Sequence, residues 1–164
     1  MNLKPQDVVV ALKLCAYPDV RPAMSIIAND LSLSPSEVHG AIGRLRASRL
    51  LHGPNLKDRP NISALEEFLV HGLKYVFPAE HGEVTRGIPT SYAAEPLKSE
   101  VAMSSDLPPV WPWHEGNTRS VGLEPLYKSV SAGGVTRSHA VSIFSACRCY
   151  SGWTRASEKL LSAI

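Results

Sequence analysis

The stretch ANDLSLSPSEVHGAIGRLRASRLL, residues 28–51, decides the fold. It carries the clearest helix start in the chain: Ser34 is a natural N-cap, Pro35 follows it, and Glu37 stands three residues after the cap. This pattern predicts a capping box, which satisfies backbone donors in the first helical turn. We therefore expect a helix that begins at Pro35 and ends near Ser48.

A second helix is expected just before this one, from about Ala23 to Leu31. Leu33 lies between the two helices, where it can fill the turn with an apolar side chain. A helix, a tight turn and a well-capped second helix together predict a helix-turn-helix. The expected buried residues are Met24, Ile27, Ala28 and Leu31 in the first of these helices and Val38, Ala41, Ile42 and Leu45 in the second.

Three further elements are expected around this unit. Apolar spacing over 3–17, with Pro5 in the first turn, predicts a helix at the start of the chain. The pattern over 50–61 predicts a short β wing, and Ser63 is expected to cap a fourth helix that Pro78 stops. The expected apolar stripe of the first helix is Val8, Val9, Ala11, Leu12 and Cys15.

The predicted fold class is mainly α: a winged helix-turn-helix with a short β wing, followed by a loop-rich segment and C-terminal helices. The winged helix-turn-helix occupies 1–61, and a connecting helix occupies 62–80. A proline-rich, ordered, irregular segment occupies 81–131, and C-terminal helices over 132–164 are expected to form a dimer or partner surface. Because about 50 residues is long for pure loop, we expect short strands or turns within 81–131.

Two motifs in the proline-rich segment leave alternatives open. Trp111 and Trp113 straddle Pro112, and they fit either the core or the lining of a ligand pocket or dimer surface. The RGIP stretch, residues 86–89, fits either a tight turn with a buried arginine partner or a ligand-facing loop.

The composition excludes several classes of protein. Of the 164 residues, 44% are hydrophobic and 20% are charged, which is typical of a soluble globular protein. No membrane span or signal peptide is expected, and three cysteines, an odd and low number, fit a reducing cytoplasm. No catalytic, metal-binding or cofactor signature appears. The sequence therefore predicts a cytoplasmic protein that is not an enzyme and has no metal or cofactor.

Basic residues are concentrated near the end of the helix predicted from Pro35 to about Ser48, which is the recognition helix of the predicted helix-turn-helix. From Arg44 to Arg59 the chain carries five basic residues and one aspartate. A local basic patch on a nearly neutral protein favours binding to a polyanion, and a simply solvated face is the alternative.

Residues 28–51 resemble the winged helix-turn-helix bacterial transcription factors, in the broad superfamily of multiple-antibiotic-resistance repressors. The matching features are a small residue and an acid before the turn, Leu-x-Leu-Ser, a valine on the recognition helix, an Arg-Leu pair and a Leu-Leu entering the wing. The stretches ALEEFLVHGLKYVFPAE (64–80), TRGIPTSYAA (85–94) and LPPVWP (107–112) are similar to a less characterised group of such regulators. The resemblance implies double-stranded DNA as the partner.

The chain departs from that family's pattern at several positions. Ser32 and the Ser48-Arg49 pair stand where the family often has glycine, and a positive φ at Ser32 would cost about 1 kcal/mol. Gly40 and Gly43 lie inside the recognition helix, where each costs about 1 kcal/mol relative to alanine. Either these glycines let the backbone approach DNA closely, or the helix no longer reads bases in detail.

The expected DNA contacts lie on the exposed side of the recognition helix and in the wing. Arg44 is the candidate to reach a guanine edge or a phosphate, whereas Arg46 and Arg49 are better placed for phosphates. Glu37 can accept from a cytosine amino group, with its capping role as the alternative. The full expected set is Ser34, Ser36, Glu37, His39, Gly40, Arg44, Arg46, Arg49, Lys57 and Arg59.

These features predict a sequence-specific DNA-binding transcriptional regulator, a repressor that acts as a homodimer on a pseudo-palindromic site. Arg44→Ala and Arg46→Ala are expected to weaken DNA binding without unfolding the chain. The alternative is an antitoxin or adaptor that binds a partner protein through its C-terminal half. For the helical unit alone, the alternative is a three-helix domain with a protein-binding surface.

Overall fold

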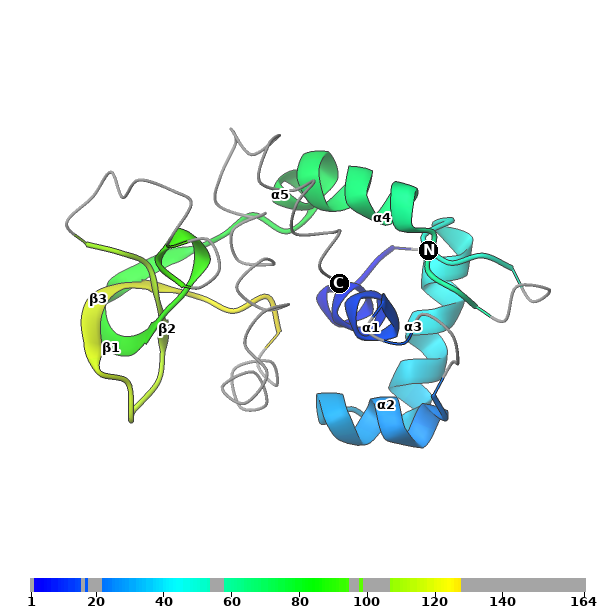
Figure 1. Ribbon diagram of the computed structural model, residues 1–164, viewed down its shortest axis with the longest axis horizontal. Helices are drawn as coiled ribbons and strands as arrows, with labels where there is room; N and C mark the ends of the chain where they lie inside the picture. The colour runs from blue at the N-terminus through cyan, green and yellow to red at the C-terminus, as the bar shows by residue number, and fades with distance from the viewer. Residues whose placement is uncertain are drawn as a thin grey trace. The chain divides into compact units, whose positions relative to one another are not determined.

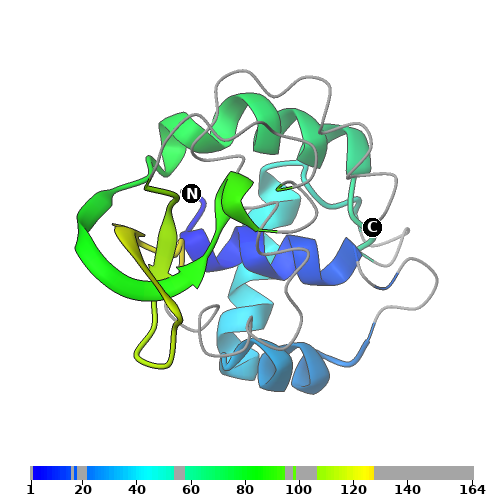
Figure 2. The same cartoon turned by 60° about the vertical axis from the view of Figure 1, so that its left-hand side comes forward.

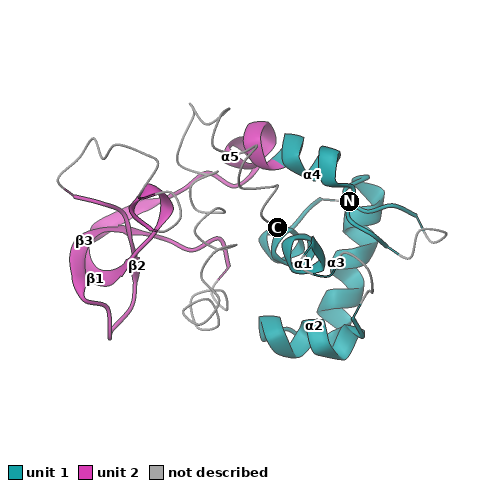
Figure 3. Cartoon of the chain, viewed as in Figure 1, with its two compact units in different colours: residues 1–68, 164 teal, residues 69–163 magenta. Residues whose placement is uncertain are grey.

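The computed structural model describes residues 2–15, 17, 22–53, 58–94, 98 and 107–127. Two compact units divide the chain, the first over residues 1–68 and the second over residues 69–163 (Figure 3). The helices predicted over 132–164 lie outside the described residues. No described helix is long and apolar enough to cross a membrane.

Three helices build most of the first unit: α1 (Pro5–Cys15), α2 (Met24–Leu31) and α3 (Pro35–Ala47). Both α1 and α2 pack on α3, and Figures 1 and 2 show α2 crossing near the N-terminal end of α3. The bounds of α2 and α3 agree with the sequence prediction to about one residue. Helix α1 is shorter than the predicted 3–17 at both ends.

The apolar face of α3 is buried as predicted, with Val38, Ala41, Ile42 and Leu45 almost inaccessible to solvent. Leu33 fills the turn and is also buried. The predicted stripe of α1 is wrong in part, because Val9, Leu12 and Cys15 are only half-buried. The apolar residues of α1 fit more than one helical face, so periodicity alone does not choose between them. The buried residues of α1 are Asp7, Val8, Val10, Ala11 and Leu14.

Helices α2 and α3 end in the same way. After α2, Ser32 takes a left-handed φ of 53°, and the backbone N–H of Leu33 donates to the carbonyl of Ala28 over 2.9 Å. After α3, Arg49 takes a φ of 60°, and the N–H of Leu50 donates to the carbonyl of Leu45 over 3.0 Å. Both ends are Schellman motifs, in which glycine is the usual left-handed residue.

A short antiparallel pairing follows α3, at the position where the wing was predicted. The N–H of Asn61 donates to the carbonyl of Leu50 over 3.0 Å, and the N–H of His52 donates to that of Arg59 over 2.9 Å. Between these bonds, Leu51 and Pro60 form an isolated bridge. The turn that joins the two sides lies outside the described residues.

The predicted fourth helix runs as three consecutive segments: α4 (Ile62–Glu67), the π-helical η2 (Phe68–Gly72) and α5 (Leu73–Val76). Its predicted cap at Ser63 is wrong. The side chain of Asn61 caps α4 by accepting from the N–H of Ala64 over 3.3 Å. Asparagine and serine are both good N-caps, and here the chain leaves the pairing at Asn61, two residues earlier.

The second unit contains a small sheet of three strands: β1 (His81–Pro89), β2 (Val110–Pro112) and β3 (Thr118–Leu123). Strand β1 pairs antiparallel with both other strands, and a parallel bridge between Val110 and Gly122 closes the arrangement. The expectation of short strands within 81–131 is confirmed. The description of this segment as irregular is wrong for β1. The strand was not predicted because its first four residues are all exposed, so the alternating pattern that marks a half-buried strand is absent there.

Candidate nucleic-acid interface

The start of α3 is built as the sequence predicted. The N–H of Glu37 donates to the Ser34 hydroxyl oxygen over 3.2 Å, and the N–H of Ser34 donates to the Glu37 carboxylate over 2.8 Å. The backbone N–H of Ser34, helped by its hydroxyl, lowers the pKa of Glu37. Of the two roles weighed for Glu37, capping is therefore the one that its side chain performs here.

Arg44 lies in a different place from the one predicted. Its guanidinium donates to both carboxylate oxygens of Asp7, over 2.7 Å from Nε and 2.6 Å from Nη2. The backbone N–H of Lys4 donates to the same carboxylate over 2.8 Å. The Asp7 side chain is fully buried and that of Arg44 is 14% exposed. Because a bidentate arginine–carboxylate pair fixes the side chain, Arg44 ties α3 to α1 instead of facing a groove.

Arg46 is also engaged within the protein. Its Nε donates to the carboxylate of Asp58, a buried residue that immediately precedes the second side of the pairing after α3. Asp58 has a left-handed φ of 56°. The predicted phosphate contact by Arg46 therefore competes with an ion pair that fastens this segment to α3. The sequence missed that competition because Asp58 is charged and gives no apolar signal of burial.

Gly40 has a role that neither interpretation of the helix glycines anticipated. A Cβ placed on Gly40 would lie 3.2 Å from Nη1 of Arg44, so the missing side chain gives the guanidinium room to reach Asp7. Gly43 is different, because a Cβ there would meet nothing within 4 Å. Of these two glycines, Gly43 is the one that presents bare helix backbone to solvent.

The exposed side of α3 is small and carries little charge. We call it the α3 face and define it by Ser36, His39, Gly43 and Ala47, all of which are exposed. The structure brings the predicted residues Ser34, Ser36, Glu37 and His39 together along the first two turns of the helix. Arg49 and Arg59 are exposed beyond its C-terminal end, and Lys57 lies outside the described residues.

Asp7 is the residue that sequence reasoning missed most plainly. A signal for it exists, since Asp7 lies one and two helical turns from Ala11 and Leu14 on the same face of α1. A carboxylate on an apolar face predicts a buried cationic partner, because a buried unpaired charge is very costly. Arg44 on α3 is that partner.

Other chemistry is sparse in the part of the chain that the structure describes. No group of three histidine, cysteine or acidic side chains there is arranged to hold a metal ion. Cys15 is free and half-buried, and burial raises its pKa to about 11, so its thiolate is scarce at neutral pH. Cys147 and Cys149 lie outside the described residues.

No protein-family model matches this chain, and no curated protein or solved structure matches it either.

Proposed function

We propose that this chain is a transcriptional regulator that binds double-stranded DNA through the α3 face, as a homodimeric repressor. The observation that carries the proposal is the α2–turn–α3 geometry. Ser32 makes the left-handed turn, Leu33 is buried, and a capped helix follows whose α3 face is exposed. A helix held in this way is the element that a helix-turn-helix inserts into the major groove.

The residues on and around the α3 face are suited to different roles in DNA binding. Ser36 and His39 are the side chains with donors and acceptors suited to base edges, and Gly43 allows the backbone to come close. Arg49 is exposed at the end of the helix and is suited to a phosphate. Arg44 and Arg46 act indirectly in this scheme, by fixing α3 against α1 and against the segment that follows it.

The antiparallel pairing after α3 supports the winged form of the motif. It has the position, direction and short length of a wing base, and the Arg46–Asp58 ion pair holds it at the C-terminal end of α3. Arg59 lies on this pairing and is exposed, so we include it, with Lys57, among the expected backbone contacts.

Fluorescence anisotropy with labelled duplexes from the region upstream of the protein's own coding sequence tests the proposal. We expect saturable binding that falls about tenfold or more as salt rises from about 50 to 200 mM, because phosphate contacts release counterions. His39→Ala should reduce the preference for the best duplex over a scrambled one. Binding that is absent at low salt on every upstream duplex would contradict the proposal.

A protein partner for the α3 face is the second candidate function. The observation in its favour is that Arg44 and Arg46, the central cations of the predicted basic patch, are already neutralised by Asp7 and Asp58. Small uncharged residues also allow another helix to pack closely. In that case DNA affinity is absent, and a partner is retained in high salt because apolar contacts are not screened.

A further inference from the structure

Two arginines face each other across the sheet of the second unit. Arg86 on β1 is the register partner of Arg119 on β3 in an antiparallel pair, so their side chains leave the same face of the sheet. Both are exposed. Within the part of the chain that the structure describes, neither guanidinium makes a hydrogen bond or an ion pair. Like charges directly opposite each other destabilise a sheet, and a bound anion would remove that repulsion.

A tight turn holds two aromatic residues next to Arg86. The N–H of Trp113 donates to the carbonyl of Arg86 over 3.1 Å, and the N–H of Gly116 closes the turn on the carbonyl of Trp113 over 3.0 Å. A Cβ on Gly116 would lie within 2.3 Å of Gly87, so glycine is needed for the turn to sit this close to β1. The rings of Trp113 and His114 lie 5.1 Å apart at 39°, and His114 is exposed.

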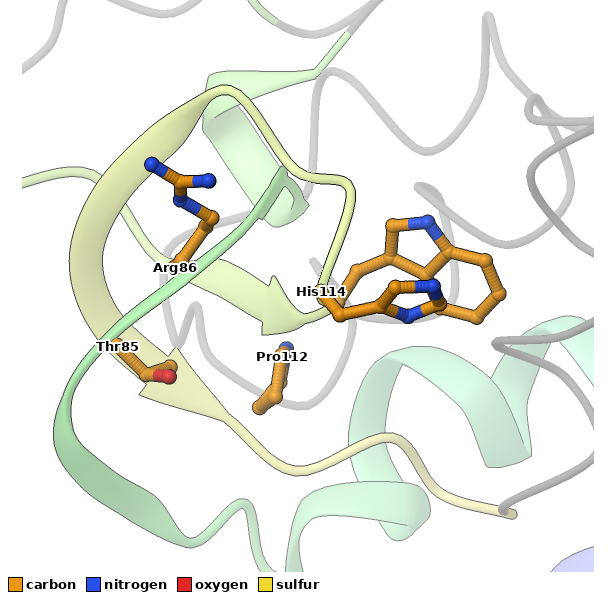
Figure 4. Close-up of a pocket in the computed structure, with 5 residues that line it drawn as sticks. Thr85, Arg86, Pro112 and His114 are labelled. Atoms are coloured by element: carbon orange, nitrogen blue, oxygen red, sulfur yellow. The ribbon is translucent and has the colours of Figure 1, made fainter.

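An open hollow of about 360 Å³ is lined by Thr85, Arg86, Pro112, Trp113 and His114 (Figure 4). Arg119 lies outside this lining, as the register partner of Arg86. The volume of the hollow lies in the range of sites for small molecules, which runs from roughly 300 to 1,000 Å³. The structure places the two motifs that the sequence left open. Trp111 is buried, whereas Trp113 lines the hollow. Both alternatives for residues 86–89 are wrong, because this stretch is the end of strand β1 and Arg86 is exposed.

We propose that this hollow, together with Arg119, binds a nucleotide: a planar base stacked on Trp113, with its phosphate between Arg86 and Arg119. Two guanidiniums can together donate to several oxygens of one phosphate, either a terminal monoester or the diester of a strand, whereas a carboxylate has only two oxygens to accept from them. Base stacking on an aromatic side chain beside cationic groups is a general mode of nucleotide binding. The nucleotide is either free or one unit of a single strand. This site is independent of the proposal for the α3 face.

Binding of adenosine 5′-monophosphate to the full chain by isothermal titration calorimetry tests the site. We expect saturable binding, weakened about tenfold by Arg86→Ala, by Arg119→Ala and by Trp113→Ala, since each removes one stacking or charge-assisted contact. Trp113→Phe should retain most of the affinity because phenylalanine also stacks. Lys98→Ala is the matched control, because it removes one exposed positive charge outside the hollow.

Three further probes identify the ligand's parts and its source. Inorganic phosphate alone and adenosine alone should each bind more weakly than the monophosphate, and equal affinity for either one would overturn the proposal. Tighter binding of an eight-residue oligothymidylate would support the site and assign it to a single strand. Thermal unfolding should show that the arginine variants fold as well as the wild type. The proposal is contradicted if neither the monophosphate nor the oligonucleotide binds at about 1 mM, or if both arginine variants bind the monophosphate as tightly as the wild type.

Discussion

The guanidinium of Arg44 on α3 donates two hydrogen bonds to the fully buried carboxylate of Asp7 on α1, which lies 37 residues earlier in the chain. This pair replaces the DNA contact that the sequence predicted for Arg44. It makes Arg44 a residue that fixes α3 against α1.

Arg44→Ala is therefore expected to destabilise the protein by about 3 kcal/mol, because it leaves the buried Asp7 charge without its partner. Urea unfolding followed by circular dichroism measures the change. The double variant Arg44→Ala/Asp7→Asn should recover part of the loss, since asparagine can still accept from Lys4 but carries no charge. An Arg44→Ala protein within about 0.5 kcal/mol of the wild type would show that the pair contributes little.

The two glycines of α3 offer a matched comparison. Gly43→Ala should stabilise the protein by about 1 kcal/mol, because alanine is the better helix former and the added methyl meets nothing. Gly40→Ala should gain less or lose stability, because its methyl crowds the Arg44 guanidinium at 3.2 Å. Equal gains in the unfolding free energy of both variants would refute the spacing role of Gly40.

Glycine at the left-handed positions after α2 and α3 should raise the stability of the protein. Ser32→Gly and Arg49→Gly are each expected to stabilise the protein by up to about 1 kcal/mol, since glycine adopts a positive φ without steric cost. Ser36→Gly is the control, because Ser36 lies in the first turn of α3, where glycine should destabilise. If chemical unfolding shows all three changes to be destabilising, the left-handed assignment fails.

The capping carboxylate predicts a specific pH dependence. Because Ser34 holds the pKa of Glu37 below its unfolded value, the stability that Glu37 provides is present above about pH 4.3 and is lost as pH falls through the lowered folded pKa. Comparing the unfolding free energy of wild type and Glu37→Gln between about pH 6 and pH 3 measures this contribution. The gap should narrow toward low pH, and a constant gap would contradict the capping account.

The sequence was informative where structure is local. The bounds of α2 and α3 follow from the cap at Ser34, the proline after it and the spacing of Val38, Ile42 and Leu45, all within one or two helical turns. The ion pairs were not predicted, because Asp7 and Asp58 meet their arginines only after the helices pack. Strand β1 was missed because exposed residues open it, so hydropathy does not alternate there.

The two candidate sites also differ in whether they depend on local or on long-range structure. Ser36, His39 and Gly43 could be placed on one side of α3 from helical spacing alone. The alignment of Arg86 with Arg119 depends on strand register, which a sequence with 32 residues between the two arginines does not specify. Long-range pairing of this kind becomes visible only in the folded chain.

The most direct test of the central claim places a negative charge in the middle of the α3 face. Gly43→Glu and the control Ser63→Glu, on the exposed side of α4, add the same charge to the same unit. By anisotropy on the best upstream duplex, Gly43→Glu should weaken binding at least about tenfold through repulsion of phosphates, while Ser63→Glu stays close to the wild type. Equal DNA affinity for Gly43→Glu and the wild type, with both proteins folded, would contradict the account.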